Sequence, residues 1–179
     1  MANYRLLDTV TLRHFGVINR MDIVEMRLTG YDRPAWTDAV RSELLRDANG
    51  DGCGRVLEAT FLGTPEDFSV SDLAEIFRIQ RALSGDTMDP LLHLGEAESI
   101  WAADRRNGTF ITDDAAAFDF AEKNLGNNRV LDCIDLLRES VAAKEITEHE
   151  AKLAADAIRN SGRHLKAGHP PTLTTDYFC

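Results

Sequence analysis

The sequence has few cysteines and no close pair of them, which excludes two classes of small protein. Cys53, Cys133 and Cys179 stand far apart and form no CxxC motif. This spacing argues against a zinc finger and against a disulfide framework, and it favours the reducing cytoplasm. No apolar run approaches the roughly 18 residues that a membrane helix needs. We therefore expect a cytoplasmic protein that makes no contact with a membrane.

Basic residues are also in short supply, since 20 Lys and Arg face 30 Asp and Glu, for a formal net charge of −10. A dedicated duplex-DNA binder usually has a basic face, so this balance argues against that class. It does not exclude an enzyme that holds nucleic acid through metal ions, because a bound cation changes the local charge. The 179 residues, 44% of them hydrophobic, are typical of one globular domain.

Short apolar strands alternate with helices along the chain. Turn residues and apolar spacing predict strands at 4–8, 56–62, 109–112 and 130–131. They predict helices from Thr9 or Thr11 to about residue 21, and at 34–47, 71–83, 95–106, 115–124, 134–144 and 147–163. Pro34 suits the first position of its helix, and Ser71 suits a cap. This alternation is typical of an α/β fold with a mainly parallel sheet.

Acidic residues follow two of the predicted strands. Leu6-Leu7 leads into Asp8, and Thr112 leads into Asp113-Asp114. Because such sheets bind ligands at the carboxyl ends of their strands, we expect these acids to converge. Carboxylates gathered without bases need a cation, and hard oxygen ligands select Mg²⁺ or Mn²⁺. The acidic candidates along the chain are Asp8, Glu43, Glu96, Glu98, Asp113, Asp114 and Asp119.

Four segments in order resemble the PIN-domain nucleases, in the branch of the VapC-like toxins. They are Leu6-Leu7-Asp8-Thr9, Val40-Arg-Ser-Glu43-Leu44, Gly95-Glu96-Ala-Glu98-Ser-Ile100 and Phe110-Ile-Thr-Asp113-Asp114. The resemblance implies a PIN-like three-layer fold with a mainly parallel central sheet. It places the nuclease domain at 1–140 and a helical C-terminal extension of the same domain at 141–179.

The resemblance also implies the site residues. As catalytic residues it indicates Asp8, Glu43, Glu96 and Asp114, which with Asp113 would hold Mg²⁺ or Mn²⁺. Glu96 and Glu98 lie about 200° apart on a helix, and the match to the Gly-Glu pattern favours Glu96. The Thr-x-Asp form of the family favours Asp114 over Asp113.

The implied activity is metal-dependent hydrolysis of RNA phosphodiesters by the toxin of a bacterial type II toxin–antitoxin pair. The implied partners are the RNA substrate, a cognate antitoxin protein and a second copy of the chain in a homodimer. Backbone phosphates of the RNA need basic side chains. The candidates for that role are Arg105, Arg106, Arg159, Arg163 and Lys166.

Two other functions stay open. Residues 47–58 fit the twelve-residue EF-hand pattern, with Gly52 at position six and Glu58 at position twelve. A non-catalytic Ca²⁺-binding module would use this loop, but Arg55 at position nine places a cation beside the ion, and a glycine-rich turn is the other interpretation. A metal-dependent phosphomonoesterase is the second alternative, because such enzymes also carry an Asp at the end of the first strand.

Overall fold

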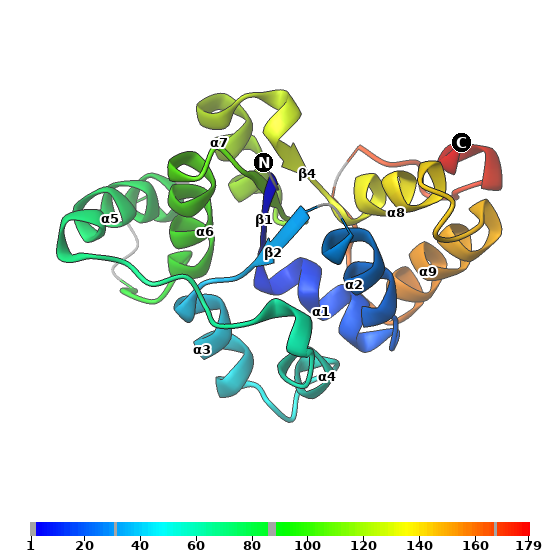
Figure 1. The fold of residues 1–179 in the computed structure, drawn as a ribbon, viewed down its shortest axis with the longest axis horizontal. Helices are drawn as coiled ribbons and strands as arrows, with labels where there is room; N and C mark the ends of the chain where they lie inside the picture. The colour runs from blue at the N-terminus through cyan, green and yellow to red at the C-terminus, as the bar shows by residue number, and fades with distance from the viewer. Residues whose placement is uncertain (1–2, 31, 86–88, 167) are drawn as a thin grey trace.

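A parallel β-sheet forms the centre of the protein, as a computed structural model shows for residues 3–30, 32–85, 89–166 and 168–179 (Figure 1). Within these residues the strand order is β2-β1-β3-β4, and every neighbouring pair is parallel. The strands are β1 (Asn3–Leu7), β2 (Asp32–Ala35), β3 (Thr109–Ile111) and β4 (Val130–Leu131). The predicted α/β class with a parallel sheet is therefore confirmed.

Helices surround the sheet and supply the crossovers that parallel strands require. They are α1 (Thr9–Val17), α2 (Met21–Thr29), α3 (Asp38–Arg46), α4 (Cys53–Leu57), α5 (Val70–Ser84), α6 (Leu94–Arg105), α7 (Ala115–Leu125), α8 (Cys133–Ala142) and α9 (Glu148–Asn160). Short 3₁₀ turns occupy Thr60–Leu62, Asn127–Arg129 and Thr175–Phe178. None of the helices in the described part of the chain is long and apolar enough to cross a membrane.

The two faces of the sheet bury separate apolar clusters. Leu6 and Phe110 pack with residues of α5, α6 and α7, whereas Leu7 and Ile111 pack with α1, α2, α3, α4, α8 and α9. This follows from the alternation of side chains along a strand. All four side chains are fully buried, which stabilises the fold by about 1.5–3 kcal/mol each. Figure 1 shows α5 and α6 on one side of the sheet and α8 and α9 on the other.

One predicted strand is wrong. Residues 56–62 form the end of α4 and a 3₁₀ turn instead. A short apolar run does not distinguish a strand from a buried helix. Here Gly52 begins the helix with a φ of 83°, and its carbonyl oxygen would lie 2.5 Å from a Cβ at Gly16. Two glycines thus let α4 pack directly against α1, with Val56 buried between them.

The boundaries of two predicted helices are also wrong. Pro34 lies in β2, and α3 begins only after the cap residue Thr37. In the described sheet β2 is an edge strand, where the missing N–H of proline leaves no ladder bond unmade. The first helix is capped by Asp8 rather than Thr9 or Thr11, and it ends at Val17.

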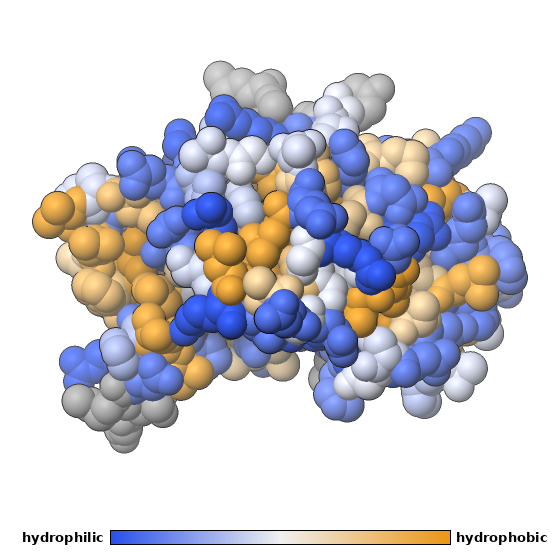
Figure 2. Space-filling view, turned by 90° about the horizontal axis from the view of Figure 1, so that it is seen from below, coloured by the Kyte–Doolittle hydropathy of each residue, from blue (hydrophilic) through white to orange (hydrophobic). Residues whose placement is uncertain are grey.

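Helix α5 confirms the helix predicted at 71–83, but Ser69 caps it rather than Ser71. Its outer face exposes Val70, Leu73 and Phe77, whereas Ile76 is buried. Apolar side chains gather at this end of the molecule in Figure 2, on the left, where Figure 1 places α5. The apolar residues that identified the helix therefore do not all belong to its buried face.

Candidate functional site

Asp8 directly follows β1 and caps α1, and it is only 1% exposed. Its carboxylate accepts hydrogen bonds from the Val10 amide and the Thr112 hydroxyl. Burial raises the pKa of Asp8 well above its ordinary value, and the negative charge of Glu96 raises this pKa further. The two hydrogen bonds lower it and offset only part of that cost.

Thr112 connects Asp8 to the second strand-end acid. Its buried hydroxyl donates to Asp8 and accepts a hydrogen bond from the Asp114 amide at 3.1 Å. Asp114 caps α7, since its Oδ1 accepts from the Ala117 amide at 2.7 Å. Both acids therefore sit at helix N-termini, where the partial positive charge of the backbone favours carboxylates.

Glu43 approaches from α3 and is half-buried. The Thr9 hydroxyl donates to its Oε2 at 2.5 Å. The other oxygen, Oε1, lies against Gly95 of α6, where a Cβ would come within 3.0 Å of it. The missing side chain at Gly95 therefore leaves room for the carboxylate between the two helices.

Glu96 is the neighbour of Gly95, in the first turn of α6. Its side chain is 16% exposed, and its Oε1 lies 3.5 Å from Nδ1 of His93. Burial raises the pKa of Glu96, and the charges of Glu43 and Asp114 also raise it, while His93 lowers it. Acids of α3 and of the α7 cap therefore raise the pKa of Glu96, and the charge of Glu96 raises the pKa of Asp8 in turn. We call the set Asp8, Glu43, Glu96 and Asp114 the acidic centre.

Glu98 is held by α3, and Asp119 lies on the surface of α7. The Oε2 of Glu98 accepts a hydrogen bond from the Ala39 amide at 3.0 Å, so that this carboxylate stabilises the first turn of α3. Asp119 is exposed on α7. The helical geometry that separates Glu96 from Glu98 in the sequence thus places them in different surroundings.

Asp113 points into the protein, with a fully buried side chain. Its Oδ2 accepts from the Thr11 hydroxyl at 3.0 Å and lies 3.2 Å from Nδ1 of His14, and its Oδ1 faces the Cys133 amide at 3.5 Å. Burial alone would raise the pKa of Asp113, but the hydrogen bonds and the charge of His14 lower it overall. The carboxylate of Asp113, which was predicted as a metal ligand, thus makes its contacts inside the protein.

The donor chemistry of the acidic centre fits a hard divalent cation. All its donors are carboxylate oxygens, and within the described residues no Lys or Arg forms an ion pair with any of them. Among those residues only His14, Asp113 and Cys133 bring three ligand atoms within 4.8 Å of one another. Within the described residues, therefore, no three ligand atoms of the acidic centre lie that close together.

The EF-hand-like loop has a different arrangement. The carboxylate of Asp47 pairs with Arg13 at 2.7 Å, and the Arg55 guanidinium donates to the carbonyls of Gly16 and Val17. Glu58, the expected bidentate ligand, is exposed just after the five-residue α4. The acids of the loop therefore serve contacts within the protein or face solvent.

Three polar residues beside the centre were not among the predicted ligands. The hydroxyls of Thr9 and Thr112 each donate a hydrogen bond to an acid of the centre. Asp132 follows β4, is buried, and caps α8. The rule that identified Asp8 and the pair Asp113-Asp114, an acid directly after a strand, would also have found Asp132.

No family model, curated protein or solved structure matches the chain. Its function is therefore inferred from the side chains and their contacts.

Proposed function

We propose that the protein is a Mg²⁺- or Mn²⁺-dependent endoribonuclease of the PIN type, acting as the toxin of a bacterial type II toxin–antitoxin pair. The observation that carries the proposal is the acidic centre itself. Four carboxylates from four segments gather at the carboxyl edge of a parallel sheet, and burial and like charge raise the pKa of Asp8 and Glu96. A divalent cation would relieve this repulsion.

The catalytic roles follow from the contacts of each side chain. Asp8, Glu96 and Asp114 are the residues that would hold the cation, with Glu43 completing the set from α3. The cation, when bound, supplies the charge that activates water and stabilises the leaving oxygen of a phosphodiester. Thr112 orients Asp8 and the Asp114 backbone, and covalent attachment of the RNA to the protein is not needed.

Thr9 and Gly95 position the Glu43 carboxylate. The Thr9 hydroxyl occupies Oε2, so that Oε1 is the atom left to accept a proton or face a ligand. Gly95 leaves the space in which Oε1 lies. These residues position the carboxylate and touch neither substrate nor cation.

The acidity of the chain supports the proposed partners. A net charge of −10 favours a basic antitoxin segment through electrostatic complementarity. The same centre that would take cations would accept a basic side chain of such an inhibitor. A homodimer belongs to the same proposal.

RNA cleavage by purified protein tests the function. We expect a labelled single-stranded RNA to be cut with Mn²⁺, to stay intact with EDTA, and to stay intact with Asp8→Asn. Asp119→Asn is the matched control, because it removes an exposed acid of α7 outside the centre, and it should cleave like the wild type. Cleavage by Asp8→Asn at the wild-type rate would refute the proposal.

The same preparation separates the alternatives. A phosphomonoesterase would hydrolyse p-nitrophenyl phosphate and leave RNA intact. A Ca²⁺-binding module would bind Ca²⁺ in the wild type and lose it in Asp47→Ala, with no effect of Asp8→Asn. The proposed nuclease predicts that Asp8→Asn loses metal-dependent RNA cleavage and that Asp47→Ala keeps it.

A further inference from the structure

The C-terminal extension contains an unusual stretch of positive charge. Residues 157–175 include no Asp or Glu, in a chain that has 30 of them. Arg159, Arg163 and Lys166 fall in this stretch, together with His164 and His169. All five line one cleft of about 310 Å³. We call it the basic cleft.

The charged groups of the basic cleft are held by neutral acceptors. Arg159 donates to the carbonyls of Pro170 and Pro171, and Arg163 donates to the Asp51 carbonyl at 3.2 Å. Lys166 Nζ lies 3.5 Å from the centre of the Phe118 ring. Among the described residues, no carboxylate lies within ion-pair distance of these three side chains.

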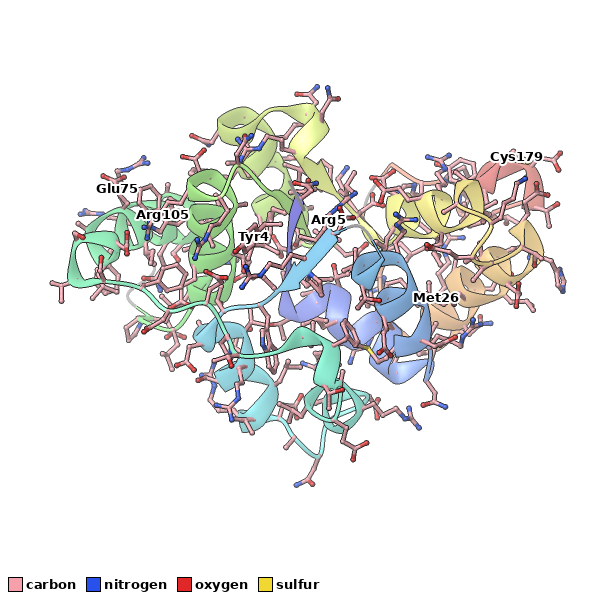
Figure 3. All side chains as sticks on the ribbon, viewed as in Figure 1. Tyr4, Arg5, Met26, Glu75, Arg105 and Cys179 are labelled. Atoms are coloured by element: carbon pink, nitrogen blue, oxygen red, sulfur yellow. The ribbon has the colours of Figure 1, made fainter. Side chains whose placement is uncertain are left out.

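The other two arginines that sequence analysis selected for phosphate contacts are paired with carboxylates. Arg105 pairs with Asp72 at 2.8 Å, and Arg106 pairs with Glu66 at 2.8 Å. Figure 3 shows Arg105 at the α5 end of the molecule, opposite Cys179 of the C-terminal end. The structure therefore divides the basic residues that sequence analysis selected for phosphate contacts. Only those of the C-terminal extension keep a charge without a carboxylate partner.

The electrostatic surroundings of Arg163 also favour an anion in the basic cleft. Burial lowers the pKa of Arg163, and the guanidinium of Arg13 lowers it further, against the weaker opposing effects of Asp51 and Asp47. Positive charge at Arg163 is thus incompletely compensated by the protein. An anion bound in the cleft would supply the missing compensation.

Two contacts connect the basic cleft to the elements that follow β3 and β4. Phe118, beneath Lys166, lies one turn after Asp114 in α7. His169 Nε2 lies 2.7 Å from Asp132, the cap of α8 that directly follows β4. Because β4 pairs with β3, His169 lies at the carboxyl end of the strand next to β3.

We propose that the basic cleft, through Arg163 and Lys166, binds the phosphate backbone of the RNA whose scissile bond lies at the acidic centre. This inference rests on the proposed ribonuclease function. Four clustered acids repel a polyanion, so the substrate needs a neighbouring surface of opposite charge. Phosphate contacts of this kind give affinity without sequence preference, and they weaken with salt.

Binding of a fluorescein-labelled single-stranded RNA of about 20 nucleotides, measured in EDTA between about 50 and 200 mM NaCl, tests the cleft. Arg163→Gln/Lys166→Gln should weaken binding about tenfold or more. It should also reduce the salt slope by about 1.4, because each phosphate contact on a single strand contributes about 0.7. Arg78→Gln/Lys144→Gln removes the same charge from exposed sites of α5 and the α8–α9 turn and should bind like the wild type.

The outcomes separate this inference from the function on which it rests. Unchanged affinity and salt slope in the cleft variant, with a wild-type melting temperature, would overturn the cleft and leave the nuclease standing if Mn²⁺-dependent cleavage is seen. Lost binding in the cleft variant alone, with no cleavage by the wild type, would support the cleft and reject the nuclease. Equal losses in the cleft and control variants would also overturn the cleft, since total charge alone would then explain binding.

Discussion

Replacing Asp8 with Asn should stabilise the metal-free protein while abolishing its activity. Asp8 is buried beside Glu96, and both effects raise the pKa of its carboxyl group above the ordinary value of 3.8. An acid whose pKa is raised by folding holds its proton more tightly in the folded state. Stability is therefore lost as pH rises through the folded-state pKa. Asn removes this penalty and keeps a cap for α1, because Asn and Asp cap helices equally well.

The direction of the shift fixes the sign of the effect on stability. Each unit by which folding raises a pKa costs about 1.4 kcal/mol once the group is ionised. In a protein of this length 1 kcal/mol moves the melting temperature by about 2–4 °C. We therefore expect Asp8→Asn to melt above the wild type at pH 7.5 in EDTA, by about 2–4 °C for each kcal/mol of penalty removed. The difference should shrink as pH falls towards 4, because the Asp8 carboxyl is then protonated in the folded state and increasingly protonated in the unfolded state.

Thermal unfolding from pH 4 to pH 8, followed by circular dichroism, measures this difference. Added Mn²⁺ should stabilise the wild type and leave Asp8→Asn nearly unchanged, because ligand binding to the folded state stabilises it. Asp119→Asn, an exposed acid, should match the wild type in both conditions. A lower melting temperature for Asp8→Asn than for wild type at pH 7.5 in EDTA would refute the reasoning, since the carboxylate would then be a net stabiliser.

Three further predictions follow from the surroundings of the acidic centre. Gly95→Ala should leave the melting temperature equal or higher, because Ala favours a helix by about 1 kcal/mol. Because the added Cβ meets Glu43, RNA cleavage should fall at least about tenfold, and unchanged cleavage would contradict the role given to this glycine. His14→Ala leaves the Asp113 carboxylate buried with its main partner removed and should cost about 3–5 kcal/mol in urea unfolding, a loss that adding Asp113→Asn should partly restore. In the native protein a thiol reagent should modify Cys179, which is exposed, and spare the two buried cysteines until urea is added; rapid modification of all three would contradict the packing.

Much of the fold follows from local patterns in the sequence. The strands β1, β3 and β4 and the helices α5 to α9 were predicted from their apolar spacing, although two of the apolar residues that identified α5, Leu73 and Phe77, are exposed. The edge strand β2 was missed, since Pro34 is a helix-start signal in isolation and only the sheet reveals that its missing N–H is harmless. The strand predicted at 56–62 failed because contact with Gly16, distant in sequence, selects a helix there.

The sequence predicts one part of the candidate site and not the rest. Asp8 and the pair Asp113-Asp114 could be found from the chain alone, because an acid directly after a strand lies at the carboxyl edge of a parallel sheet. The preference for Asp114 over Asp113 came from the family resemblance. The environment of Asp113 could not, since His14 and Cys133 approach it from elements far away in sequence. The basic cleft was also beyond sequence analysis, because only the structure shows which arginines already have carboxylate partners.

The most direct test of the account is the position of Mn²⁺ in crystals of the protein, located by anomalous scattering. The proposal predicts a peak bound by oxygens of the acidic centre, with Asp8 and at least one of Glu96 and Asp114 among the ligands, and no such peak in Asp8→Asn. Full occupancy at the His14, Asp113 and Cys133 group or in the loop at 47–58, with none at the acidic centre, would contradict it.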